Sequence, residues 1–191
     1  FVRALYIDYY SIHAGFKRDF ELEGELLINP VGKYYALEGI CKNIEWFNRE
    51  FPDTKLALEN LYPNNSNKES CFFMHINEIV KFLEKDKATY LLLDLGHLKV
   101  SSQLLRFNYF DAVETLLERY SKRILEIHLS ENSGKYDDHE IVTFKSVQYA
   151  IICRYIGIIR KNDIKITIEA RNYSLKYIEK CYKLFAGVNN I

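Results

Sequence analysis

The sequence predicts an α/β barrel, in which parallel strands form a closed ring and a helix follows each strand. Three observations carry this prediction. Short apolar runs alternate with helical stripes of apolar residues along the whole chain. Carboxylate and imidazole side chains stand where the apolar runs end. No Gly-x-Gly-x-x-Gly and no Gly-x-x-x-x-Gly-Lys-Ser/Thr motif follows a run, so a nucleotide-binding open sheet loses support.

The chain of 191 residues is shorter than the roughly 250 residues of a complete eight-stranded barrel. It also opens directly on an apolar run without a methionine. We therefore expect residues 1–191 to form a single, partial barrel domain with about five strand–helix units, and two or three preceding units to be absent from the sequence.

The first third of the chain gives the first two units. The apolar and aromatic run Ala4–Ser11 predicts a strand, and the polar residues after Gly15 predict a long loop. Apolar residues at helical spacing predict a helix over Leu37–Phe47. Lys55–Leu58 predicts a short strand, and the Asn-rich Asn60–Lys68 predicts a loop.

The middle of the chain gives the third unit. Ile76–Leu83 carries a helical stripe, and Tyr90–Leu93 is the near-continuous apolar run typical of a strand buried on both faces. We expect a loop over Gly96–Phe107 and a further helix over Ala112–Tyr120, where apolar residues again recur at helical spacing.

The last third completes the pattern. Arg123–Ile127 and Ile164–Ile168 predict strands, and Ser130–Val142 predicts a polar loop. Apolar residues at helical spacing predict helices over Phe144–Arg160 and Leu175–Phe185. Because successive crossovers between parallel strands are right-handed, this series builds either an open sheet or a barrel.

Composition narrows the classes of function. The 26 basic and 26 acidic residues cancel, so the net charge gives no general attraction to nucleic acid, although a local basic patch stays possible. The four cysteines form no Cys-x-x-Cys pair and are expected to be reduced and buried. No apolar run reaches membrane-spanning length and no signal peptide opens the chain, which predicts a cytoplasmic protein without a membrane partner.

Four candidate metal ligands end apolar runs in different segments: Glu59, Asp94, His128 and Glu169. The carboxyl ends of parallel strands meet at one face of a barrel, where active sites are built. Each of these residues alone has an ordinary structural explanation, such as a loop cap or a hydrogen-bonded core histidine. Their joint occurrence predicts a divalent-metal site, which His97, three residues after Asp94, is placed to join.

Further candidate ligands lie outside this set: His13, Asp137 and His139. The Asp137-x-His139 spacing suits a pair of ligands, but it fits a solvated polar loop about as well, and Asp138 could ligate instead of Asp137. Additional imidazoles shift preference from Mn²⁺ toward Zn²⁺ or Fe, and they allow one to three ions. His75 is expected to be a surface or packing residue.

The ordered series resembles the ligands of the xylose-isomerase-like TIM-barrel superfamily, which includes sugar isomerases and epimerases, endonuclease IV-like nucleases and iron-dependent peptide-modifying enzymes. The matching segments are Glu59-Asn60, Asp94-Leu95-Gly96-His97, His128-Leu129, Asp137-Asp138-His139 and Glu169. In endonuclease IV-like members the Asp-x-His pair holds an additional metal, and His13 takes the place of a histidine that helps to bridge two ions. The Thr-Cys pair and the Gly-rich segment of those nucleases are missing here.

The resemblance implies two enzyme classes. The first is a multinuclear metal hydrolase of endonuclease IV type that acts on a phosphoester, in which Glu59 bridges two ions or orients the nucleophile.

The second is a mononuclear sugar or sugar-phosphate isomerase or epimerase. Here Glu59 and Glu169 exchange a proton with a substrate carbon, while His97 and Lys135 contact substrate oxygens. A non-catalytic barrel and an iron-dependent modifying enzyme are further alternatives, and the sequence favours the hydrolase narrowly.

Overall fold

The computed structural model describes residues 8–15, 18–23, 26–34, 37–64, 71–171 and 173–188. The chain forms two compact units, Phe1–Leu92 and Leu93–Ile191. Strand β5 (Tyr90–Asp94) contributes its first three residues to the first unit and its last two to the second.

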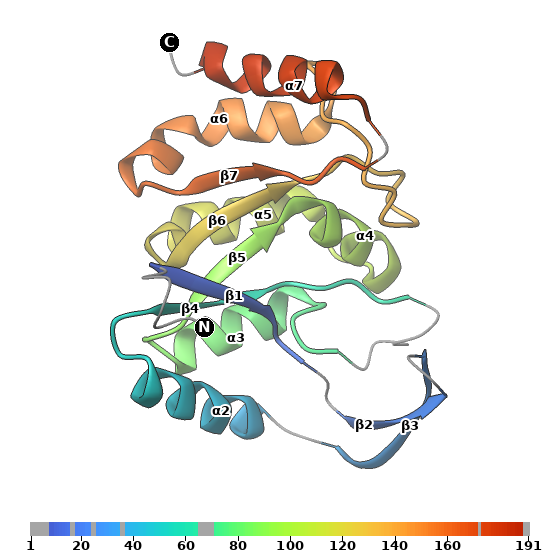
Figure 1. Cartoon of the computed structure of the whole chain (residues 1–191), viewed down its shortest axis with the longest axis vertical. Coiled ribbons are helices and arrows are strands. Elements are labelled where there is room, and N and C mark those ends of the chain that lie inside the picture. The colour runs from blue at the N-terminus through green and yellow to red at the C-terminus, as the bar shows by residue number, and fades with distance from the viewer. Residues whose placement is uncertain are drawn as a thin grey trace. The chain divides into compact units, whose positions relative to one another are not determined.

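In the first unit, parallel strands follow the order β1-β4-β5, with β1 at Tyr9–His13 and β4 at Lys55–Glu59 (Figure 1). Helix α2 (Leu37–Glu50) precedes β4 and helix α3 (Ile76–Lys85) precedes β5. The predicted helices and the strand at Lys55 are therefore confirmed. The start of the predicted strand Ala4–Ser11 lies outside the described residues, and β1 continues two residues beyond its predicted end.

The long loop predicted after Gly15 is wrong. Strands β2 (Arg18–Glu23) and β3 (Leu26–Tyr34) pair there as an antiparallel hairpin. The sequence feature that indicates the first of these strands is a short alternation of polar and apolar residues at positions 19–23. This period of two is typical of a strand even where charged residues are abundant.

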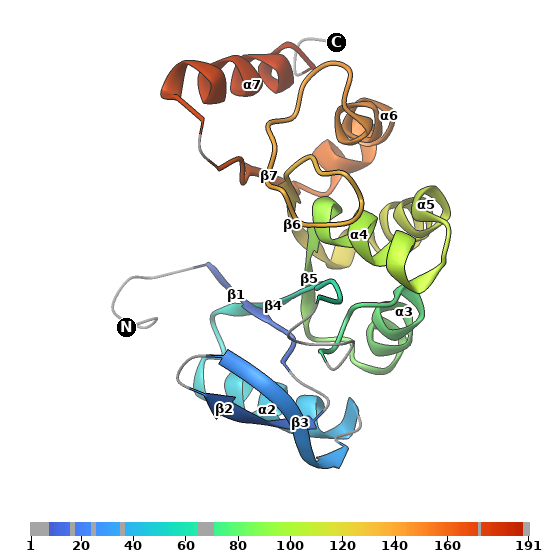
Figure 2. The same ribbon diagram turned by 90° about the vertical axis from the view of Figure 1, so that its right-hand side faces the viewer.

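In the second unit, the end of β5 is followed by helices α4 (Leu95–Leu105) and α5 (Tyr109–Arg119), which pack against each other (Figure 2). The rest of this unit alternates strand and helix. Its elements are β6 (Ile124–Leu129), α6 (Val147–Lys161), β7 (Lys165–Ile168) and α7 (Leu175–Val188). The strand order is β5-β6-β7, and β6 and β7 run parallel.

The loop predicted over Gly96–Phe107 is also wrong, because α4 occupies most of it. Asp94 caps the helix, accepting a hydrogen bond from the His97 N–H at 2.7 Å. No helical stripe marks α4 in the sequence, because nearly all of its residues from Leu95 to Ser102 are buried, including Ser101 and Ser102. A helix buried all round lacks the polar face that periodicity detects.

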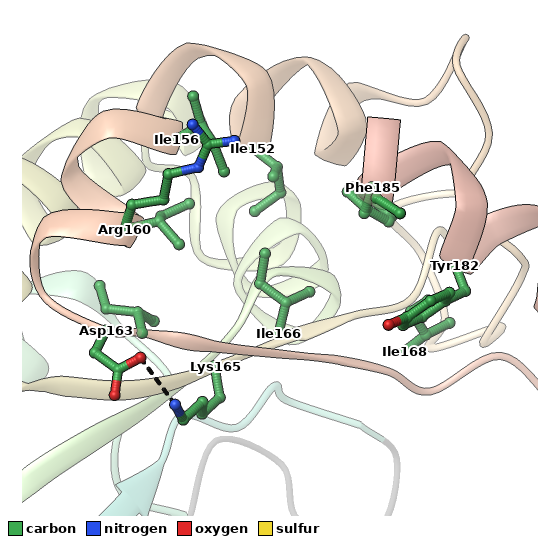
Figure 3. Close-up of a pocket in the computed structure, with 12 residues that line it drawn as sticks. Ile152, Ile156, Arg160, Asp163, Lys165, Ile166, Ile168, Tyr182 and Phe185 are labelled. Atoms are coloured by element: carbon green, nitrogen blue, oxygen red, sulfur yellow. Dashed lines mark hydrogen bonds and ion pairs between the residues drawn. The ribbon is translucent and has the colours of Figure 1, made fainter. Parts of the chain in front are cut away.

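The strand cores are apolar and closely packed. Leu91, Leu92 and Leu93 of β5 are at most 1% exposed. On one side of β7, isoleucines face α6 and α7 and line a cavity of about 380 Å³ (Figure 3). Since side chains alternate along a strand, Thr167 points to the opposite side of β7 from Ile166 and Ile168.

The five parallel strands of the described residues alternate with helices as predicted. All four cysteines are free thiols, as predicted, and two of them are buried. None of the helices in the described segments combines the length and the apolar character needed to cross a lipid bilayer.

The packing of β5 predicts a stability difference between two leucine substitutions. Leu93→Ala removes a side chain that is 0% exposed and should lower the free energy of unfolding by about 2–5 kcal/mol. Leu104→Ala, at a side chain 48% exposed, should change it by less than about 0.5 kcal/mol. Urea unfolding of both variants measures the difference, and equal effects would contradict a buried β5.

Candidate metal centre

Asp94, His128 and Glu169 bring their ligand atoms together in the second unit. One donor atom of each lies within 4.8 Å of the others. Asp94 ends β5, His128 lies on β6, and Glu169 directly follows β7. The Glu169 N–H donates to the Leu129 carbonyl at 2.9 Å, which extends the β6–β7 pairing and fixes the backbone of Glu169. Three successive strand ends thus position the three side chains.

The distances define a small, charged cluster. His128 Nδ1 lies 3.1 Å from Glu169 Oε1 and 4.0 Å from Asp94 Oδ2. Asp94 is completely buried, whereas the Glu169 side chain is 32% exposed. Within the described part of the chain, the buried His128 Nδ1 makes no hydrogen bond, so its short approach to Glu169 is an electrostatic contact.

The pKa values respond to this crowding. Burial raises the pKa of Asp94, although the nearby His97 opposes the effect. Burial alone would lower the pKa of His128, but contact with the Glu169 carboxylate and the charge of Glu126 raise it above 6.5. The close contact with His128 lowers the pKa of Glu169 below 4.5 despite partial burial.

A divalent cation fits this donor set. A buried imidazole nitrogen without a hydrogen bond and two carboxylates are the ligands used for Mn²⁺, Fe²⁺ and Zn²⁺. Burial raises the pKa of Asp94 because the ionised carboxylate is poorly solvated, and a nearby dication would reverse that penalty.

A second cluster involves the predicted Asp-x-His pair. Asp137 Oδ2 lies 2.6 Å from His139 Nε2 and 3.4 Å from His97 Nε2. The Asp137 side chain is 6% exposed, whereas Asp138 is exposed and accepts hydrogen bonds from the Ser133 N–H and hydroxyl. Of the two aspartates, Asp137 is therefore the one that faces the histidines.

The loop that carries this cluster is held at several points. Two backbone hydrogen bonds join Glu131 and Glu140, and the Asn132 side chain donates to the Gly96 carbonyl at 2.9 Å. A side chain at position 96 would place its Cβ 2.6 Å from Ser130 Oγ, so the close approach of α4 to the end of β6 requires glycine.

His139 adopts a left-handed backbone conformation (φ 51°), and its Nδ1 lies 2.9 Å from the Glu169 carbonyl oxygen. The loop is therefore tied directly to the residue that follows β7.

In the first unit, His13 and Glu59 are register partners at the ends of β1 and β4. His13 Nε2 lies 3.5 Å from Glu59 Oε2, and their side chains are 65% and 12% exposed. The structure thus pairs these two predicted ligands, and their role beside Asp94 stays a prediction. Lys135, the predicted substrate contact, is an exposed loop residue. His75 caps α3, since its Nδ1 accepts from the Asn77 N–H at 3.1 Å.

Glu126 is a buried neighbour of His128 that was not among the residues predicted from the sequence. This residue is 8% exposed, and its Oε1 lies 3.3 Å from His128 Nε2. The signal was present, since residues two apart on a strand share a face, so Glu126 had to lie beside His128 if His128 pointed inward.

Comparison with known proteins identifies the fold. No protein-family model matches the sequence, and no curated protein matches it. A solved crystal structure of a D-tagatose 3-epimerase-like protein does match, with a TM-score of 0.58 and 20% sequence identity. The match covers 80% of this chain and 54% of that chain, so this chain spans about half of that structure. The predicted fold class, an incomplete α/β TIM barrel, is confirmed.

The His128–Glu169 contact predicts a pH-dependent stability. The pKa of His128 is raised from 6.5, so the contact stabilises the metal-free fold below pH 6.5 and is lost as pH rises through the raised value. The pKa of Glu169 is lowered from 4.5, so the contact is also lost as pH falls below that range. Glu169→Gln should therefore destabilise the protein by about 0.5–1 kcal/mol more at pH 5.5 than at pH 9.

Urea unfolding in EDTA measures this difference. The matched control is Glu179→Gln, which removes an exposed carboxylate 2.6 Å from Lys183 and should have the same small effect at both pH values. A Glu169→Gln effect independent of pH would contradict the assignment.

Proposed function

We propose that this chain is the metal-binding part of a sugar isomerase or epimerase that uses one divalent cation. The observation that carries the proposal is the compact set of Asp94, His128 and Glu169. The fold match to a D-tagatose 3-epimerase-like protein supports the same reaction class. Glu59, which ends β4, is proposed as the fourth ligand, as the sequence resemblance implies.

The donor geometry favours this proposal over the endonuclease IV-like hydrolase that the sequence favoured narrowly. In the second unit, Asp94, His128 and Glu169 bring their donor atoms within 4.8 Å of one another, which is the arrangement that one cation requires. Phosphoester hydrolysis by a multinuclear centre needs cations at both the attacking and the leaving oxygen.

The residues suggest how a proton moves. Glu169 is ionised at neutral pH because its pKa is lowered, and it is the most exposed member of the set. It can therefore accept a proton from the substrate carbon next to a carbonyl group, and the electron pair passes toward the carbonyl oxygen. A protonated Glu59 would return a proton to the carbon, and proton exchange with solvent would then restore Glu59 to its protonated form and Glu169 to its ionised form. A bound divalent cation would polarise the carbonyl oxygen.

Metal binding itself gives the first test. Asp94→Asn keeps an N-cap for α4, because asparagine caps helices as well as aspartate does. It removes one charged ligand and should weaken Mn²⁺ binding by at least about tenfold, which corresponds to about 1.4 kcal/mol. The matched control Asp138→Asn changes an exposed carboxylate that bonds Ser133 and should leave Mn²⁺ affinity unchanged. Isothermal titration should also give one ion per chain, and equal affinities of the two variants would contradict the assignment.

Proton exchange gives the second test. With Mn²⁺ and a panel of ketoses and aldoses in D₂O, the wild-type protein should incorporate deuterium at the carbon next to the carbonyl group. Glu169→Gln should lower the rate by at least about 100-fold, because general acid–base residues contribute factors of this size. Asp138→Asn again serves as the control. Mass spectrometry of the sugar measures the label, and no incorporation across the panel by metal-loaded wild type would overturn the proposal.

A further inference from the structure

Glu126 and Thr167 form a buried polar pair behind His128. Glu126 lies two residues before His128 on β6, and Thr167 is the register partner of His128 on β7. The Thr167 hydroxyl donates a short hydrogen bond to Glu126 Oε1. The same oxygen lies 3.3 Å from His128 Nε2. One carboxylate oxygen therefore receives a hydroxyl from one strand and faces an imidazole nitrogen from the other.

The two nitrogens of His128 face different surroundings. Nε2 faces Glu126, while Nδ1 faces Glu169 and Asp94 at 3.1 and 4.0 Å. An ionised carboxylate only accepts hydrogen bonds, so the Nε2–Oε1 contact favours a proton on Nε2, whereas the closer approach of Glu169 Oε1 to Nδ1 makes no hydrogen bond within the described residues. In a neutral imidazole, that proton leaves a lone pair on Nδ1, and Nδ1 is the buried atom that makes no hydrogen bond within the described residues.

We propose that Glu126, held in place by Thr167, is a positioning residue that selects the Nε2–H tautomer of His128 and so presents Nδ1 to a divalent cation. The inference rests on the proposed function and extends it to residues that do not touch the ion. Thr167 restrains rotation of the Glu126 carboxylate, because the Thr167 hydroxyl donates a hydrogen bond to Oε1, the same oxygen that faces the His128 ring. Carboxylates in this relation to a ligating histidine typically change metal affinity by about 10–100-fold.

Paired substitutions separate hydrogen bonding from packing. Thr167→Val keeps the shape of the side chain and removes the hydroxyl, whereas Thr167→Ser keeps the hydroxyl and removes a methyl group. A hydrogen-bonding role predicts weaker Zn²⁺ binding in the valine variant and near-wild-type binding in the serine variant, and a packing role predicts the reverse. Glu126→Leu should lose about 10–100-fold in Zn²⁺ affinity, and Glu126→Gln, which keeps an acceptor oxygen, should lose less. Glu118→Gln, on the exposed side of α5, is the control and should bind as wild type does.

The experiment has two readouts on the whole chain. Competition with a zinc chelator gives the affinity, and circular dichroism checks that each variant is folded. Imidazole ¹⁵N NMR of the metal-free protein at pH 9 gives the tautomer of His128, which should be Nε2–H in wild type and a mixture in Glu126→Leu and Thr167→Val.

The tautomer decides the proposal even if the protein fails to bind metal. If wild type does not bind Zn²⁺ or Mn²⁺, the proposed function falls, while an Nε2–H ring that is lost in Thr167→Val still supports the positioning pair. An Nδ1–H ring in wild type overturns the inference, and so does unchanged Zn²⁺ affinity in both Glu126→Leu and Thr167→Val.

Discussion

The burial of negative charge at the strand ends is the constraint on which the second unit depends. Four carboxylates lie there beside three imidazoles, and Asp94 has no exposure to solvent. The carboxylates belong to Asp94, Glu126, Asp137 and Glu169, and the imidazoles to His97, His128 and His139. Neutral imidazoles do not balance this charge, and desolvating carboxylates without a counter-charge costs several kcal/mol. Protons on the imidazoles would balance this charge at low pH, and the proposed cation would balance it at neutral pH.

Asp94 links this charge problem to the fold. One carboxylate oxygen caps α4, and the other faces the imidazoles of His97 and His128. The direction of α4 and the position of a candidate ligand atom are thus set by one side chain. Gly96 allows the helix start to lie against Ser130, and Asn132 bonds the Gly96 carbonyl, so the loop that carries Asp137 is built on the same helix start.

The sequence predicted the strands well because a strand buried on both faces leaves a continuous apolar run, as at β5. The sequence did not predict α4 for a related reason. A helix that is largely buried shows no stripe of apolar residues set against a polar face. The ends of strands also pointed to Asp94, His128 and Glu169, whose donor atoms the structure brings together. Glu126 lies within β6 rather than at its end, so only the two-residue spacing from His128 could have pointed to it.

The three candidate metal ligands of the second unit differ in how far their side chains are exposed to solvent, and this difference suggests different roles. The side chains of Asp94 and His128 are 0% and 12% exposed, so they can hold an ion but cannot readily reach a substrate. Glu169 is 32% exposed, and the contact with His128 keeps it ionised by lowering its pKa. A carboxylate that binds an ion with one oxygen and faces solvent with the other can take a proton from a carbon held beside that ion. In the tautomer we propose, the imidazole of His128 would offer its lone pair to an ion rather than a proton to a substrate, which would leave Glu169 as the base in this unit.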